Sequence, residues 1–156
     1  MASGLSGHLR PLPDLPDSHR PDVKSFLCHL GAIWAGSRQG LYRVGPETAT
    51  FLPDWRDLGE IMALGPAPGG LRVAHRQCGV WFLSACAANG RRGKFSLFDA
   101  DEPSCLLENR AFWVGGKQNL YRLDGSAWTP VLPDSLAGHV DWLREIDGHL
   151  WVALLK

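Results

Sequence analysis

An internal repeat constrains the fold of this chain more than any other feature of the sequence. The segments Ile33–Val44 and Phe112–Leu123 align at every one of their positions without a gap. A degenerate copy covers Leu71–Leu83, where Arg72 replaces the tryptophan of the other copies, and a truncated copy runs over Leu150–Lys156. A match of this length predicts that the chain folds as a series of similar structural units.

The spacing of the copies shows how many units there are. Equivalent positions fall at Trp34, Arg72, Trp113 and Trp151, with separations of 38, 41 and 38 residues. The motif Leu-Pro-Asp recurs at Leu12, Leu52 and Leu132, at intervals that correspond to one repeat and two repeats. Four repeats of about 39 residues therefore fill residues 1–156 as a single domain.

Each repeat has the pattern of four short β-strands. Short apolar or alternating runs are separated by turn signals, and 18 Gly, 11 Pro and 7 Trp in 156 residues do not suit a helical protein. The second strand carries the tryptophan, the third carries Leu-Tyr-Arg, and the fourth ends at Leu-Pro-Asp. Asp147-Gly148 and Asp124-Gly125 predict tight hairpins, with Pro68-Gly69-Gly70 in the second repeat. The first strands are predicted at Val23–His29, Ile61–Leu64, Ser104–Glu108 and Val140–Ile146.

The repeat is divided between the two ends of the sequence. Val140–Leu154 supplies only two strands, and we predict that Ala2–Ser6 and His8–Leu12 complete that unit. Four-stranded repeats of about 40 residues are typical of β-propeller blades. The predicted fold is all-β, a small β-propeller of four blades whose last blade is completed by N-terminal strands. A strand-swapped homodimer with an eight-bladed ring is the alternative to the monomer.

The repeated segments resemble known propeller repeats. Ile33–Val44 and Phe112–Leu123 are similar to the two-component regulator propeller repeats of bacterial sensor kinases. Asp124–Val131 resembles tectonin-type repeats, which occur in carbohydrate-binding and pathogen-recognition propellers. These motifs specify a blade and not a ligand, so the resemblance implies the fold and carries little information about function.

Composition excludes several classes of function. Sixteen basic residues balance sixteen acidic ones, so no net charge attracts nucleic acid or an anionic membrane. The chain has no apolar run long enough to cross a bilayer, and Met1–Arg20 has prolines and charges where a signal peptide has its apolar segment, so we expect a cytoplasmic protein. Four cysteines without a CxxC or Cys/His cluster predict buried, reduced thiols, no metal site and no cofactor.

The candidate binding surface is the end where loops between second and third strands meet loops between one repeat and the next. The loops between second and third strands carry a cation in each repeat. Three of these cations are candidate ligand-binding residues: Arg38, Arg76 and Lys117. They predict either a basic ring for an anionic ligand or acidic partner, or ion pairs with the neighbouring loop acids. The second interpretation is favoured, because the loop acids outnumber these cations.

The remaining candidates are one arginine and three histidines. Arg72 breaks the aromatic pattern and could mark a functional blade, whereas the repeated Trp and Tyr positions are expected to pack between blades. His19, His75 and His139 could meet at the channel mouth, but no catalytic motif accompanies them. The predicted function is a non-enzymatic recognition module that binds a protein partner or a ligand through the loop face. The alternatives are a carbohydrate or small-anion binder, and a propeller-fold lyase or hydrolase with a channel-mouth histidine.

Overall fold

The computed structural model describes residues 22–76, 79–84 and 90–155. Within these ranges the regular structure is β-strand, apart from a 3-10 helix at Pro53–Leu58. This confirms the all-β prediction. No helix of the described residues is long and apolar enough to span a membrane.

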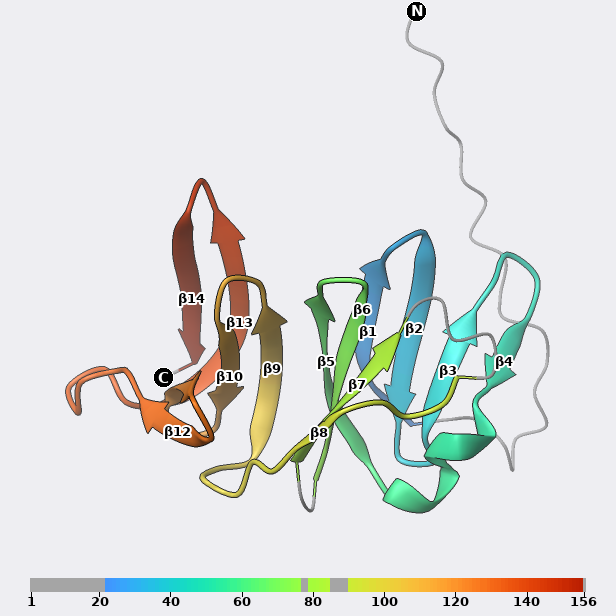
Figure 1. The fold of residues 1–156 in the computed structure, drawn as a ribbon, viewed down its shortest axis with the longest axis horizontal. Helices are drawn as coiled ribbons and strands as arrows, with labels where there is room; N and C mark the ends of the chain where they lie inside the picture. The colour runs from blue at the N-terminus through green and yellow to red at the C-terminus, as the bar shows by residue number, and fades with distance from the viewer. Residues whose placement is uncertain (1–21, 77–78, 85–89, 156) are drawn as a thin grey trace, which may run out of the picture.

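The strands form four antiparallel sheets in chain order, three with four strands and one with two (Figure 1). The first sheet contains β1 (Val23–His29), β2 (Ala32–Ser37), β3 (Leu41–Val44) and β4 (Ala49–Phe51). The second contains β5 (Ile61–Ala67), β6 (Gly70–His75), β7 (Gly79–Ser84) and β8 (Phe95–Ser96). The third contains β9 (Pro103–Glu108), β10 (Phe112–Gly116), β11 (Leu120–Asp124) and β12 (Ala127–Pro130), and the fourth contains β13 (His139–Ile146) and β14 (His149–Leu155).

The predicted strands agree closely with this structure. The first strand of the first repeat has the predicted bounds, and the other three first strands extend the predictions by one to three residues. Asp147 and Gly148 both have positive φ, as a two-residue hairpin of this type requires. The predicted strands Ala2–Ser6 and His8–Leu12 lie outside the described residues, so completion of the fourth sheet stays a prediction.

Successive sheets pack face to face through apolar side chains. Trp34 and Leu41 of the first sheet contact Ile61 and Leu71 of the second. The first strands lie beside one another in the order β1, β5, β9 and β13 (Figure 1). Two further clusters repeat the arrangement between the second and third sheets and between the third and fourth. The core is therefore a set of three similar interfaces, as the sequence repeat predicts.

Small residues let these sheets approach closely. A Cβ added to Gly65 in β5 would lie 2.3 Å from the carbonyl oxygen of Leu106 in β9. Neither backbone can move without disrupting its sheet, so only glycine fits at this position.

The two end sheets differ from the inner ones because, within the described ranges, each packs on another sheet on one side only (Figure 1). Trp34 and Tyr121 are buried between sheets, as predicted for the repeated aromatic positions, but Trp151 on β14 is exposed. The expectation that every repeated aromatic is buried is therefore wrong at Trp151. The reason is that no described segment covers the outer face of the fourth sheet.

The cysteines are only partly as predicted. Cys105 lies between the third and fourth sheets, where burial raises the pKa of its thiol to about 11. Cys28 is exposed on β1, so the prediction of a buried thiol is wrong there, because its side chain points to the uncovered face of the first sheet. Cys78 and Cys86 lie outside the described residues.

Candidate functional site

Acidic and basic side chains meet at one end of the first three sheets. In each of these sheets an acidic residue directly precedes the first strand, and a basic residue directly follows the second strand. Since these two strands are antiparallel neighbours, the two residues lie side by side: the amide of Arg38 donates to the carbonyl of Asp22, and that of Arg76 donates to the carbonyl of Glu60. We call the resulting set the charged ladder; it consists of Asp22, Arg38, Glu60, Arg76, Glu102 and Lys117.

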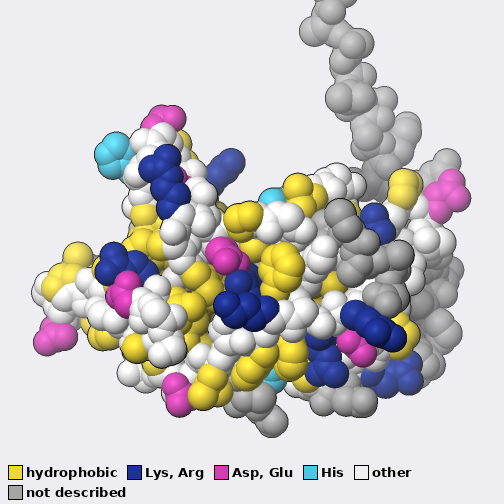
Figure 2. Space-filling view, in the orientation of Figure 1, with side chains coloured by type: hydrophobic (Ala, Val, Ile, Leu, Met, Phe, Trp, Pro, Cys, Tyr) yellow, Lys and Arg dark blue, Asp and Glu magenta, His cyan; other side chains and the backbone are white. Residues whose placement is uncertain are grey.

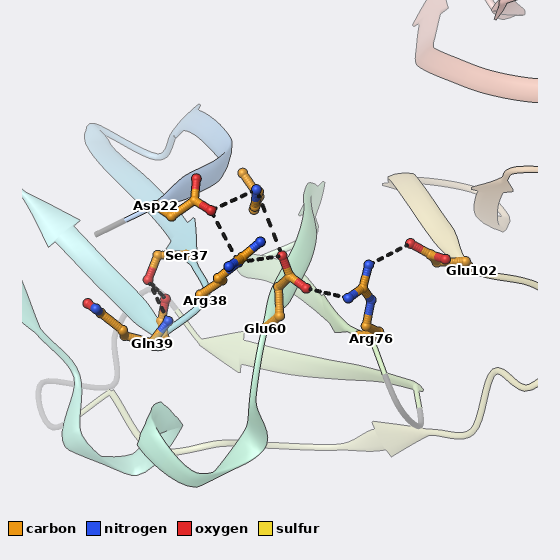
Figure 3. A network of polar contacts seen from close by, with 9 residues as sticks. Asp22, Ser37, Arg38, Gln39, Glu60, Arg76 and Glu102 are labelled. Atoms are coloured by element: carbon orange, nitrogen blue, oxygen red, sulfur yellow. Dashed lines mark hydrogen bonds and ion pairs between the residues drawn. The ribbon is translucent and has the colours of Figure 1, made fainter. Parts of the chain in front are cut away.

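The ion pairs of the charged ladder cross from sheet to sheet (Figure 3). The Nε atom of Arg38 lies 3.1 Å from an Asp22 oxygen and 3.6 Å from a Glu60 oxygen. Arg76 lies 3.1 Å from Glu60 through Nη1 and 3.6 Å from Glu102 through Nη2. The Nζ atom of Lys117 lies 2.9 Å from Glu102. Each arginine is therefore held by carboxylates from two consecutive sheets.

The cations of the charged ladder face solvent more than the carboxylates between them. The side chains of Arg38, Arg76 and Lys117 are 64%, 54% and 52% exposed, whereas that of Glu60 is 12% exposed. The hydrogen bond from Lys117, followed by the nearby charges of Lys117 and Arg76, lowers the pKa of Glu102. Glu102 therefore stays ionised at neutral pH, and its carboxylate holds Lys117 and Arg76 at the surface.

The charged ladder stops at the fourth sheet. The register position that corresponds to Glu60 and Glu102 is His139, opposite Leu155, so the fourth sheet has neither a carboxylate nor a Lys or Arg side chain at these positions. Lys24 adds a further cation at the other end, 2.9 Å from Asp22. Figure 2 shows the wider surface, on which acidic and basic groups lie next to one another instead of gathering by sign.

The predicted cationic residues are thus brought together, and they form the ion pairs with neighbouring loop acids that the favoured interpretation of the sequence predicted. Arg38, Arg76 and Lys117 share one end of the molecule, and each is paired with a neighbouring loop acid. Sequence reasoning placed Asp22, Glu60 and Glu102 among the loop acids but did not single them out. The signal was present, because Asp22, Glu60 and Glu102 each stand directly before an apolar strand.

The predicted histidines are not brought into one cluster. His75 is buried at the end of β6, where burial and then the charge of Arg92 lower the pKa of its ring. His139 begins β13, two sheets away along the chain order, and is only partly buried. His19 lies outside the described residues.

Arg72 is buried in the packing between the second and third sheets. Its guanidinium lies between the rings of Phe82 and Phe112, 5.2 and 4.7 Å from their centroids, and donates to both oxygens of Glu108. In the first sheet Trp34 on the second strand pairs with Arg43 on the third, 5.7 Å from ring to guanidinium.

The second sheet retains this cation–π pair with the two strands exchanged. Arg72 on β6 stands opposite Phe82 on β7, whereas Trp113 on β10 stands opposite Arg122 on β11. The change from tryptophan to arginine at position 72 is therefore matched by an aromatic residue on the next strand. Glu108 was not foreseen, because no local pattern links residues this far apart in the sequence.

Among residues 22–76, 79–84 and 90–155, no three His, Cys, Asp or Glu side chains are grouped so as to hold a metal ion. A hollow of about 340 Å³ is lined by Gly31, Arg43, Pro46 and Thr50, at the hairpin end of the first sheet and away from the charged ladder.

No family model and no curated protein matches this chain. Its resemblance to two-component regulator and tectonin-type propeller repeats therefore stays a prediction from the repeated motifs.

Proposed function

We propose that the four sheets are blades of a β-propeller and that the protein is a non-enzymatic recognition module, which binds a protein partner through the end that carries the charged ladder. The propeller arrangement is supported by the order of packing. Each sheet packs on the next one in the chain, with first strand beside first strand, as the inner strands of blades do.

The charged ladder is the observation that carries the binding proposal. It fixes three basic groups at one repeat position on three consecutive sheets, with carboxylates between them. A rigid row of charges loses little conformational freedom on binding, which favours recognition. Charge complementarity of this kind contributes mainly to specificity and association rate.

The pairing favours a protein partner over a small anion or a carbohydrate. A small anion needs several donors that converge on it, whereas Arg38, Arg76 and Lys117 already hold carboxylates. A protein surface can present acidic and basic groups that alternate to match the ladder. A cytoplasmic location without a nucleic-acid or membrane partner stays a prediction from the sequence.

The test is to replace Arg38, Arg76 and Lys117 together by Gln and to compare proteins retained from a cell lysate by the variant and by the unchanged protein. We expect the triple variant to lose a partner that the unchanged protein retains, and to keep its cooperative melting transition. Binding should also weaken as salt rises, because exposed charges are screened over about 8–10 Å at physiological ionic strength.

A matched control replaces arginines that lie outside the charged ladder. Arg110 and Arg122 are exposed, and Arg122 pairs with Asp124 on its own strand. Changing both to Gln should leave the partner bound. If the triple variant retains every partner of the unchanged protein, the charged ladder is not the binding surface.

A further inference from the structure

In the part of the chain that the structure describes, each of the two end sheets leaves a large apolar face uncovered. On the first sheet Phe26 is 66% exposed, and Ile33 beside it is also exposed. On the fourth sheet Trp151 is 57% exposed, and Trp142 lies on the same exposed face. The two sheets stand at opposite ends of the row of sheets (Figure 1), so these faces do not cover each other.

The uncovered face of the first sheet is the same face that the inner sheets bury. Phe26 pairs with Ala35 across β1 and β2, as Leu64 pairs with Val73 and Leu106 with Val114. Leu64 and Leu106 are both buried against the preceding sheet. Phe26 therefore occupies an interface position from which the preceding sheet is missing.

Ile33, on the second strand of the same sheet, also occupies an interface position. It pairs with Cys28, and its counterparts in the next two sheets, Leu71 and Phe112, are buried in the interfaces with the sheets before them. The exposed face of the first sheet thus has the composition of an inner interface.

The uncovered face of the fourth sheet is the opposite half of that interface. Trp151 pairs with Arg144 across β13 and β14, at the register position that Trp34 has in the first sheet and Trp113 in the third. Trp34 is buried against the second sheet, and Trp113 packs toward the fourth. Trp151 is the same residue at the same position, and no following sheet covers it among the described residues.

We infer that these faces bind each other between two copies of the chain, with the fourth sheet of one copy packed on the first sheet of the other. This inference rests on the proposed propeller arrangement. Each face matches what its counterpart already buries inside the chain, so a second copy supplies both missing halves. Four sheets per chain then give an eight-bladed ring, within the usual range of four to eight blades, whereas three copies would exceed it. Two identical head-to-tail contacts close the ring.

The internal interfaces predict which residues touch across this contact. A Cβ added to Gly36 would lie 2.5 Å from Ile61 of the next sheet, and one added to Gly115 would lie 2.7 Å from Val140. The register counterparts of these two pairs at the chain ends are Ala153 and Val23. Ala153 of one copy should therefore lie against Val23 of the other.

The experiment is a disulfide cross-link between differently tagged chains in which the exposed Cys28 is replaced by Ser, one carrying Val23→Cys and the other Ala153→Cys. We expect a covalent pair of one chain of each kind after mild oxidation, and none when Thr129→Cys replaces the first variant. Light scattering of the unchanged protein should give twice the chain mass of 17.1 kDa. A mass of one chain, an assembly larger than two copies, or cross-linking equal to that of the Thr129 control overturns the inference.

A single chain that carries both Val23→Cys and Ala153→Cys tests whether the ring closes within one chain. A disulfide within one chain of single mass would mean that the four sheets close a ring by themselves, which also overturns the inference. In a separate variant, Trp151→Glu should convert the dimer to single chains with an unchanged circular dichroism spectrum, because this side chain is exposed in the single chain. Leu136→Glu, which introduces the same charge at an exposed leucine away from both faces, should leave the dimer intact.

The test of the dimer is independent of the test of partner binding by the charged ladder. The charged ladder variant changes none of the residues on the two uncovered faces, so it should keep the dimer mass. A dimer that forms without partner binding removes only the proposed function, and partner binding by a single chain removes only the proposed assembly.

Discussion

The pair formed by Arg72 and Glu108 allows the sharpest prediction about stability. The side chain of Arg72 is 8% exposed and lies between two aromatic rings, and Glu108 is the carboxylate that balances its charge. The Nη2 atom of Arg72 donates to Oε1 of Glu108 at 3.1 Å. Glu108→Gln removes the charge and keeps the volume, so it leaves a buried cation without its counterion.

The expected cost follows from the burial of the two partners. Removing one partner of a fully buried ion pair costs about 3–5 kcal/mol. The Glu108 side chain is 25% exposed, so water compensates part of that loss, and we expect about 2 kcal/mol. For a chain of this length that corresponds to a fall in Tm of roughly 4–8 °C. Urea and thermal denaturation followed by circular dichroism measure both quantities.

A double variant separates this explanation from simple loss of packing. Arg72→Met with Glu108→Met removes both charges and fills the space between the rings with apolar groups, so it should be more stable than Glu108→Gln alone. The control is Asp124→Asn, which breaks the exposed pair with Arg122 and should leave Tm almost unchanged. The reasoning is refuted if Glu108→Gln melts with the control, or if the double variant is the least stable of the three.

Three further outcomes are expected. Gly65→Ala places a methyl group against the backbone of Leu106 and should destabilise the fold by about 1–3 kcal/mol in urea denaturation, whereas Gly45→Ala, where the nearest atom is 3.4 Å away, should not. Burial lowers the pKa of His75, so as pH falls the imidazole is protonated in the unfolded chain before it is protonated in the folded protein. The free energy of unfolding should therefore fall as pH drops below about 6.5. His75→Gln should reduce this pH dependence in melts between about pH 7.5 and 5, above the range where the carboxylates titrate. Cys105, with its pKa raised to about 11, should resist alkylation at pH 8 in the folded protein and react after unfolding, as peptide mass analysis would show.

The sequence predicted local structure well because the repeat supplied several copies of the same pattern. The strand at Val23–His29 and the hairpin at Asp147-Gly148 depend on alternation and on positive φ, which are properties of neighbouring residues. The cations Arg38, Arg76 and Lys117 were also placed correctly at one end, since equivalent positions of a repeat must occupy equivalent places.

The sequence placed acids beside the cations of their own sheets, but the ion pairs that cross between sheets were beyond it. The acid that each cation would bind depends on how far one sheet is rotated and shifted against the next, and Arg76 contacts carboxylates of two sheets. The binding of Arg72 to Glu108 depends on the same packing, because the two residues are 36 positions apart.

The sequence by itself therefore determined the repeated four-stranded unit and the end at which its basic residues gather, because backbone hydrogen bonding and turn geometry act over a few residues. Only the tertiary structure decided that identical positions have different surroundings. Trp34 is buried and Trp151 is exposed although both occupy the same register position, because burial depends on whether another sheet follows. A repeated sequence specifies the surface that each sheet presents, and the number of neighbouring sheets determines which of those surfaces meet water.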